Sequence, residues 1–158
     1  TVTISVEAAG YFASTNEFAV KALEDTQARI LLNKRPEKPN VVVQGKELKL
    51  KQQVHFQHDP AEILPVSTAI LEEIAEVIKN KPDIRAVEVQ GHTDNQGTAA
   101  YNLRLSQNRA QAVVDTLIKL GVDPSRLEAK GYGGTKPLMP NSTEANKARN
   151  RRVQLIIK

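Results

Sequence analysis

The sequence of 158 residues has no cysteine and no tryptophan, and aromatic residues make up 4%. Without cysteine the chain forms neither disulfides nor thiolate metal sites, and cysteine usage leaves both periplasm and cytosol open. No apolar run approaches the roughly 18 residues of a membrane helix. We expect any membrane anchor to lie outside this sequence. The chain also opens without a signal-peptide layout, so we interpret it as a piece of a longer protein.

The chain also lacks a large excess of charge of one sign. The 22 Lys and Arg residues oppose 18 Asp and Glu residues, which leaves a net charge of +4. A mild basic excess favours anionic partners, among them nucleic acid and an anionic cell wall. Nucleic-acid binding needs clustered basic side chains and aromatic stacking platforms, whereas basic and acidic residues alternate here. The sequence therefore disfavours a nucleic-acid partner.

Short β-type runs at 3–6, 18–20 and 28–32 predict two or three antiparallel strands in the first 33 residues. So few strands are not stable alone. We interpret residues 1–33 as the remnant of an upstream β-sandwich module, and they resemble the end of a carboxypeptidase-regulatory-like β-sandwich. Residues 34–41 combine charges with two prolines, which predicts a linker.

Residues 42–158 carry the periodicities of one larger domain. A hairpin is expected at 41–43 and 48–50, then a strand through Val54 and Phe56, strands at 87–91, 127–131 and 153–157, and helices at 65–81, 98–120 and 144–150. The residues expected to face the core from the second helix are Leu103, Ala110, Val113, Val114 and Leu117. This order predicts an α+β fold, a two-layer α/β sandwich with a βαβαβ-type mixed sheet and two long helices on one face.

Four short motifs occur in order within this domain. They are Gly91-His92-Thr93-Asp94, then Asn102 with Leu105-Ser106, then Arg109-Ala110, and finally Asn150-Arg151-Arg152-Val153. With an apolar strand before the first motif and an amphipathic helix carrying the next two, the region from about 42 to 158 resembles the OmpA-like C-terminal domain family. That family is a peptidoglycan-binding module of envelope proteins. The resemblance implies noncovalent wall binding rather than catalysis.

The resemblance also implies a ligand and two principal binding residues. The ligand is the diaminopimelate residue of the peptidoglycan stem peptide, and the positions that match are Asp94 and Arg109. Diaminopimelate ends in a small zwitterion with an ammonium and a carboxylate on one carbon. An ionised aspartate can accept hydrogen bonds from the ammonium, while a planar guanidinium can bind the carboxylate through two parallel hydrogen bonds. A stem with lysine at that place lacks the carboxylate and would leave the arginine unpaired.

Further residues are implied as the rim of the same site. They are Asn102, Leu105, Phe56, Asp59 and Arg151. On the second helix, Asn102, Ser106 and Arg109 follow at steps of four and three, so they share one face. Many relatives carry an acidic residue directly after the Phe56 position, whereas this chain has Gln57-His58-Asp59-Pro60, so different rim contacts are expected there.

Each of these residues has a purely structural alternative. Asp94 alone would be a turn or helix-capping carboxylate, and for Arg151 a fixed salt bridge that pins the final strand is favoured over ligand binding. His92, a hydrogen-bonded loop histidine in this interpretation, could combine with Asp94, His55 and His58 in a metal site, but no helical pair of ligands supports it. We expect no metal and no cofactor.

Catalysis finds no candidate either. The run Gly131-Tyr132-Gly133-Gly134 offers no helix N-terminus and predicts a tight turn rather than a phosphate cradle. No serine has nucleophile context, and no carboxylate pair suggests glycoside hydrolysis. We expect a periplasmic, wall-associated module of a protein anchored in the outer membrane. A stator-like or secretion-system subunit with secondary wall binding is the alternative, and a homodimer stays open.

Overall fold

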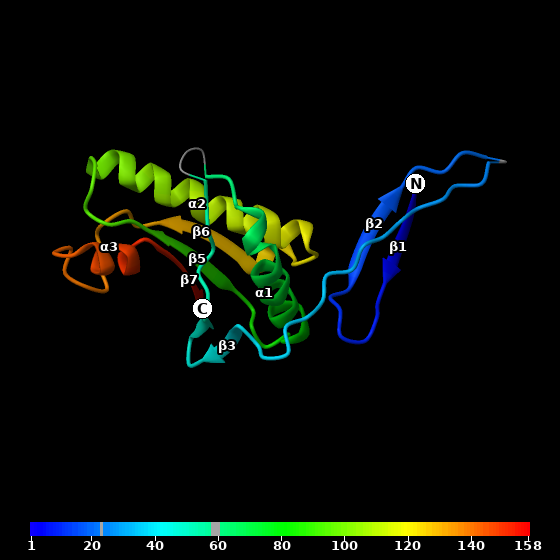
Figure 1. Ribbon diagram of the computed structural model, residues 1–158, viewed down its shortest axis with the longest axis horizontal. Helices are drawn as coiled ribbons and strands as arrows, with labels where there is room; N and C mark the ends of the chain where they lie inside the picture. Colours follow the sequence, from blue (N-terminus) through cyan, green and yellow to red (C-terminus); the bar gives the residue numbers. More distant parts are fainter. Residues whose placement is uncertain (23, 58–60) are drawn as a thin grey trace. The chain divides into compact units, whose positions relative to one another are not determined.

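The computed structural model describes residues 1–22, 24–57 and 61–158 and divides into two compact units, Thr1–Lys38 and Pro39–Lys158 (Figure 1). Each unit is described by itself. Across the described ranges, no helix combines the length and the apolar composition that crossing a membrane requires.

The first unit is built on one antiparallel hairpin. Strand β1 (Val2–Val6) pairs with β2 (Ser14–Phe18), and Lys34 and Arg35 return to the hairpin's loop, where the Arg35 N–H donates to the Gly10 carbonyl at 2.8 Å. The expected strand at 28–32 is absent from the described chain, and the prediction was wrong there. That segment has no neighbouring strand to pair with, and its Leu31 side chain is 81% exposed.

The second unit contains a five-stranded mixed sheet in the order β3-β4-β7-β5-β6 (Figure 1). The bounds are β3 (Val41–Gln44), β4 (Glu47–Leu50), β5 (Val87–His92), β6 (Leu127–Gly131) and β7 (Arg152–Ile157). Strand β5 is parallel to β6 and antiparallel to β7. Strands β5 and β6 and the helix that connects them form the parallel crossover unit that the sequence predicts.

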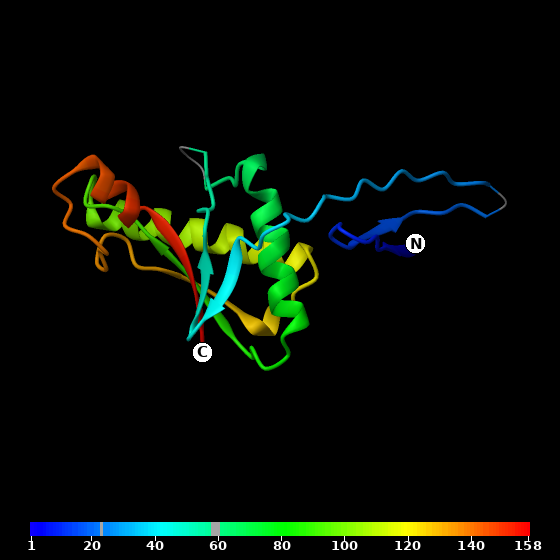
Figure 2. The same cartoon turned by 60° about the horizontal axis from the view of Figure 1, so that its bottom comes forward.

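Two long helices complete the second layer. After a 3-10 turn (Pro65–Ser67) come α1 (Thr68–Asn80) and α2 (Ala99–Lys119), which cross on the same face of the sheet (Figure 2). A second 3-10 turn (Pro124–Arg126) and α3 (Glu144–Asn150) follow. The core consists of apolar side chains from both helices and from alternate positions of the strands, such as Ile74, Leu117, Val89 and Leu155. The α+β two-layer prediction is confirmed.

Two glycines allow α2 to lie close to the sheet. Gly91 and Gly131 stand side by side on β5 and β6. A Cβ on Gly91 would lie 2.1 Å from the Ser106 carbonyl oxygen, and one on Gly131 would lie 2.4 Å from the Gln107 nitrogen. Any side chain at either position would push the helix backbone away. The sequence analysis assigned Gly131 to a tight turn, whereas in the structure both glycines allow close packing of α2.

Two expectations about local structure need correction. Leu103 was expected in the core because it is seven residues before Ala110, yet it is 52% exposed. Helix α2 is about 31 Å long and β5 about 20 Å, so the first turns of the helix extend past the strand ends. Around Val54 and Phe56 the structure has no named strand, only an isolated bridge between Phe56 and Ile63.

Arg126 joins the turn before β6 to the end of α1. Its guanidinium donates to the carbonyl oxygens of Ile78 (2.7 Å), Lys81 (2.9 Å) and Ile84 (2.6 Å). Ile78 is in the last turn of α1, and Lys81 and Ile84 lie in the segment that follows it, so these bonds hold the end of the helix and the next loop against the turn before β6.

We expect Arg126→Ala to lower the free energy of unfolding by about 2 to 3 kcal/mol, because it leaves half-buried carbonyls without a charged donor. Urea denaturation would measure the change. The control is Lys79→Ala, which removes one exposed bond to the Leu120 carbonyl and should cost less than about 1 kcal/mol. Equal effects of the two variants would contradict this role of Arg126.

Candidate functional site

Asp94 follows β5 directly and is held by its own loop. Its side chain is 7% exposed, and its Oδ1 accepts the Gln96 backbone N–H at 2.9 Å. This is the local bond that makes aspartate favourable in turns. The Thr93 hydroxyl donates to the Asp94 carbonyl at 2.8 Å. The carboxylate is therefore fixed at the point where β5 ends and the chain turns toward α2.

Buried polar groups of α2 tie the surrounding loops together. The Asn102 amide donates to the carbonyls of Gln96 (2.7 Å) and Asp94 (3.4 Å). One turn later, the Ser106 hydroxyl accepts the Gly133 N–H at 2.9 Å, while the Thr93 N–H donates to the Gly133 carbonyl at 2.9 Å. The resemblance placed Asn102 in the rim of the ligand site. In the structure its amide nitrogen holds the loop that carries Asp94 and Gln96.

The second oxygen of Asp94 belongs to an ion pair. Arg151, just after α3, donates from Nη1 to Asp94 Oδ2 at 2.7 Å and from Nη2 to Glu144 Oε1 at 2.7 Å. The hydrogen bond to Asp94, and then that to Glu144, raises the pKa of Arg151 above its ordinary value. Arg151 is thus a permanent cation, and it forms the salt bridge that the structural interpretation of this residue expected.

Arg109 lies elsewhere on the same helix, seven residues after Asn102. Its guanidinium carbon is 5.2 Å from the centre of the Phe56 ring, a cation–π arrangement. Leu105 is half-buried one turn before Arg109. The structure therefore brings together Phe56 and Arg109, with Leu105 beside them on the helix. Asp59, predicted for this rim, lies outside the described residues.

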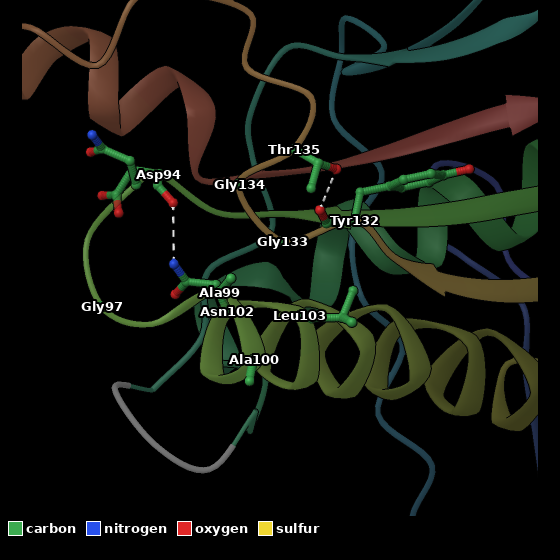
Figure 3. Close-up of a pocket in the computed structure, with 11 residues that line it drawn as sticks. Asp94, Gly97, Ala99, Ala100, Asn102, Leu103, Tyr132, Gly133, Gly134 and Thr135 are labelled. Atoms are coloured by element: carbon green, nitrogen blue, oxygen red, sulfur yellow. Dashed lines mark hydrogen bonds between the residues drawn. The ribbon is translucent and has the colours of Figure 1, made fainter.

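A pocket of about 460 Å³ opens beside Asp94, between the start of α2 and the loop after β6 (Figure 3). Figure 3 shows the Leu103 side chain pointing toward the Gly133–Gly134 loop and the Asp94 carbonyl facing Asn102. Small side chains and backbone form most of its walls. The lining residues are Asp94, Asn95, Gly97, Ala99, Ala100, Asn102, Leu103, Tyr132, Gly133, Gly134 and Thr135.

His92 does not lie in a loop, contrary to the sequence interpretation. It is the last residue of β5, it is 2% exposed, and its ring stacks on Tyr132 with centroids 5.4 Å apart. Its Nε2 lies 3.3 Å from Gln90 Oε1. Burial, reinforced by the charges of Arg152 and Lys136, lowers the pKa of His92 to about 4. The ring is therefore neutral at pH 7.

This depressed pKa predicts acid sensitivity of the fold. Between about pH 6.5 and pH 4 the unfolded chain binds a proton at His92 that the folded chain does not, so stability falls as the pH falls. We expect a loss of about 2 kcal/mol between pH 7 and pH 5 from this group. Hydrogen bonds from Lys158, Gln90 and Tyr132 lower the pKa of Glu88 to about 2 despite its burial, so its own loss lies below about pH 4.5.

Urea denaturation at pH 7, 6 and 5 would measure the loss. His92→Gln should flatten the dependence in this window, whatever its stability at pH 7, because glutamine does not titrate. His55→Gln, which changes an exposed histidine, is the matched control. An unchanged slope in His92→Gln would refute the assignment.

One partner of the site escaped the sequence interpretation. Glu144 begins α3 and pairs with Arg151, yet an acidic residue in the first turn of a helix is common for dipole reasons alone and gave no signal. The exposed Leu103 was missed for the geometric reason given above. Among the residues that the structure describes, no three histidine or carboxylate side chains gather as a metal cluster.

This fold and this loop arrangement define a class of protein. The model of the OmpA family matches residues 55–151, a stretch that includes α1, β5, α2, β6 and α3. The chain belongs to the OmpA family.

Two known proteins are similar to this chain in sequence. The chain is 45% identical over 101 residues to outer membrane porin F of Pseudomonas fluorescens, covering 64% of this chain and 31% of the porin. It is 36% identical over 104 residues to the peptidoglycan-binding protein ArfA of Mycobacterium tuberculosis, covering 66% of this chain and 32% of ArfA. The match thus spans about a third of the length of each of these two relatives.

The fold is also similar to a solved structure, the peptidoglycan-associated lipoprotein of Burkholderia pseudomallei. The TM-score is 0.61 and the identity 37%, covering 69% of this chain and 92% of that one. This match covers nearly the whole of that solved chain.

Proposed function

We propose that this chain binds peptidoglycan noncovalently through the diaminopimelate residue of the stem peptide and so tethers an envelope protein to the cell wall. Family membership supports the general role, because one relative is named a peptidoglycan-binding protein and the similar solved structure a peptidoglycan-associated lipoprotein. The observation that carries the proposal is Asp94, an almost fully buried carboxylate that is held in place and belongs to a residue lining a pocket.

In this proposal Asp94 accepts hydrogen bonds from the ammonium of the ligand's zwitterionic end. Each carboxylate oxygen can accept two hydrogen bonds, and the described contacts use one on each, from Gln96 and from Arg151. Lone pairs therefore remain for an ammonium. Because the carboxylate is positioned before the ligand arrives, little ordering cost falls on binding.

Arg109 is proposed to bind the carboxylate of the same end group. Its Cα lies about 10 Å along the helix axis from that of Asn102, which contacts the Asp94 loop. Helical side chains lean toward the N-terminus, and the N-terminal end of α2 is the end beside the Asp94 loop. The guanidinium lies over the Phe56 ring, and a planar guanidinium binds a carboxylate edge-on through two parallel hydrogen bonds.

The role requires only modest affinity at each site. Peptidoglycan repeats the same stem many times, so a tethered domain that dissociates meets another stem at high effective concentration. We place the domain in the periplasm, with its anchor to the outer membrane in segments outside this sequence. Phe56, Leu105 and Asp59 complete the proposed rim.

The proposal is tested by cosedimentation with purified sacculi. The chain should pellet with them, and a stem peptide that contains diaminopimelate should release it, whereas the same peptide with lysine should not. Both peptides need an amidated C-terminus, so that the only free carboxylate at the reading end is that of diaminopimelate. A chain that stays in the supernatant would refute wall binding and leave a protein partner as the function of this fold.

A further inference from the structure

Arg151 stands between two carboxylates that differ in exposure. It lies 2.7 Å from Asp94, whose side chain is 7% exposed, and 2.7 Å from Glu144, whose side chain is 71% exposed. The Arg151 side chain itself is 37% exposed. Glu144 belongs to the first turn of α3, and Arg151 caps the other end of that helix. The Arg151 cation is thus already paired with Asp94, the carboxylate that binds the ligand's ammonium in the proposed function.

This resident cation changes what Asp94 can bind. Any ligand cation that uses the remaining lone pairs of Asp94 must lie within a few ångströms of the Arg151 guanidinium. Two like charges at that distance repel, and the small exposure of Asp94 limits screening by water. Repulsion from Arg151 therefore weakens the binding of a lone ammonium to Asp94.

A zwitterionic end group escapes most of this repulsion. Its own carboxylate sits on the same carbon as its ammonium, so the group that approaches Arg151 carries no net charge. The same arginine that disfavours a lone ammonium therefore tolerates an ammonium with a neighbouring carboxylate.

We propose that Arg151 is a specificity-determining residue, the resident counter-ion of Asp94 that makes the site reject a lone ammonium and accept a zwitterion. The inference rests on the proposed function, because it assumes that the ligand's ammonium binds Asp94. It assigns Arg151 a task different from that of Arg109. Arg109 increases the affinity for a ligand that has the carboxylate, and Arg151 lowers the affinity for a ligand that lacks it.

Glu144 has a supporting task in this arrangement. It provides Arg151 with a second acceptor on the solvent side, so the guanidinium can give up part of its bonding to Asp94 when a ligand binds and still remain paired. Without the Glu144 carboxylate, Arg151 would depend on Asp94 alone and compete harder with the ligand. Glu144 is thus a positioning residue for Arg151.

The test is calorimetric titration of the two amidated stem peptides, one with diaminopimelate and one with lysine, into the wild-type chain and three variants. In Arg151→Gln we expect the lysine peptide to gain affinity, so that the preference for diaminopimelate falls about tenfold. Arg151→Lys retains the cation and should retain most of the preference. Glu144→Gln should weaken the diaminopimelate peptide about two- to fivefold while the preference persists.

A purely structural role of Arg151 gives a different pattern. If the ion pair only held the loop in place, both peptides would lose affinity by the same factor in Arg151→Gln, and their ratio would not change. That result, or a ratio that rises, would overturn the inference while leaving wall binding intact. Binding of neither peptide by the wild-type chain would overturn the inference together with the proposed function. Thermal melts of each variant identify any loss of fold.

Discussion

Replacement of Arg109 by alanine is expected to remove most binding to sacculi while the domain stays folded. The variant loses a bidentate, charge-assisted interaction with the ligand carboxylate, which corresponds to about 2 to 4 kcal/mol and thus to a loss of affinity of roughly 30- to 1,000-fold. The variant also loses the contact with Phe56, so thermal melts should accompany the binding assay to verify that it stays folded. Cosedimentation over a range of sacculus concentrations would measure the affinity.

The matched control is Arg104→Ala, which removes the same charge from an exposed position on the same helix. It should bind as the wild-type chain does, because Arg104 is not part of the proposed site. A general attraction to an anionic polymer would depend on net charge and would weaken equally in both variants. Equal losses in the two variants would show nonspecific electrostatic binding. Wild-type affinity in Arg109→Ala would remove Arg109 from the site.

Gly91→Ala is expected to be the most damaging single substitution for the fold. The added Cβ would lie 2.1 Å from the Ser106 carbonyl oxygen and 2.8 Å from its carbon, which are backbone atoms of α2. The helix would have to move off the sheet, and the core side chains between them would lose contact. We expect a cost of about 3 kcal/mol or more, seen as a fall in melting temperature of roughly 10 °C.

Gly45→Asn serves as its control. Gly45 is in the β3–β4 turn at φ 60°, where asparagine is tolerated, and a Cβ there meets nothing within 4 Å. Its melting temperature should stay within a few degrees of the wild-type value. A Gly91→Ala variant equally close to wild type would show that α2 does not depend on this close approach.

Much of the second unit could be predicted from periodicity. Strand β6 and helix α3 have the predicted bounds, and α2 differs by one residue at each end. Strand β6 has an alternating pattern, and α2 has an apolar stripe that ends before a glycine. The segment around Val54 and Phe56 has the same alternation, yet it forms only one bridge. Alternation shows which face a strand would bury and does not show whether a partner strand is available.

The site was less accessible to this reasoning. Asp94 and Arg109 were chosen by motif, and no pattern in the sequence could show that Arg151 would reach Asp94 across 57 positions. Such a contact depends on where α3 ends relative to β5, which only the assembled sheet decides. Leu103 was misplaced for a similar reason. The face of α2 that carries it is buried only where strands of the sheet lie beneath the helix.

The central claim is that Asp94 and its surroundings bind the zwitterionic end of diaminopimelate. Its most direct test is calorimetric titration of the amidated diaminopimelate stem peptide into the wild-type chain and into Asp94→Asn. Asparagine keeps an oxygen for the Gln96 N–H and so preserves the loop, but it removes the charge. The account predicts saturable binding to the wild-type chain, at least about tenfold weaker in the variant, whereas equal affinity for both proteins would contradict it.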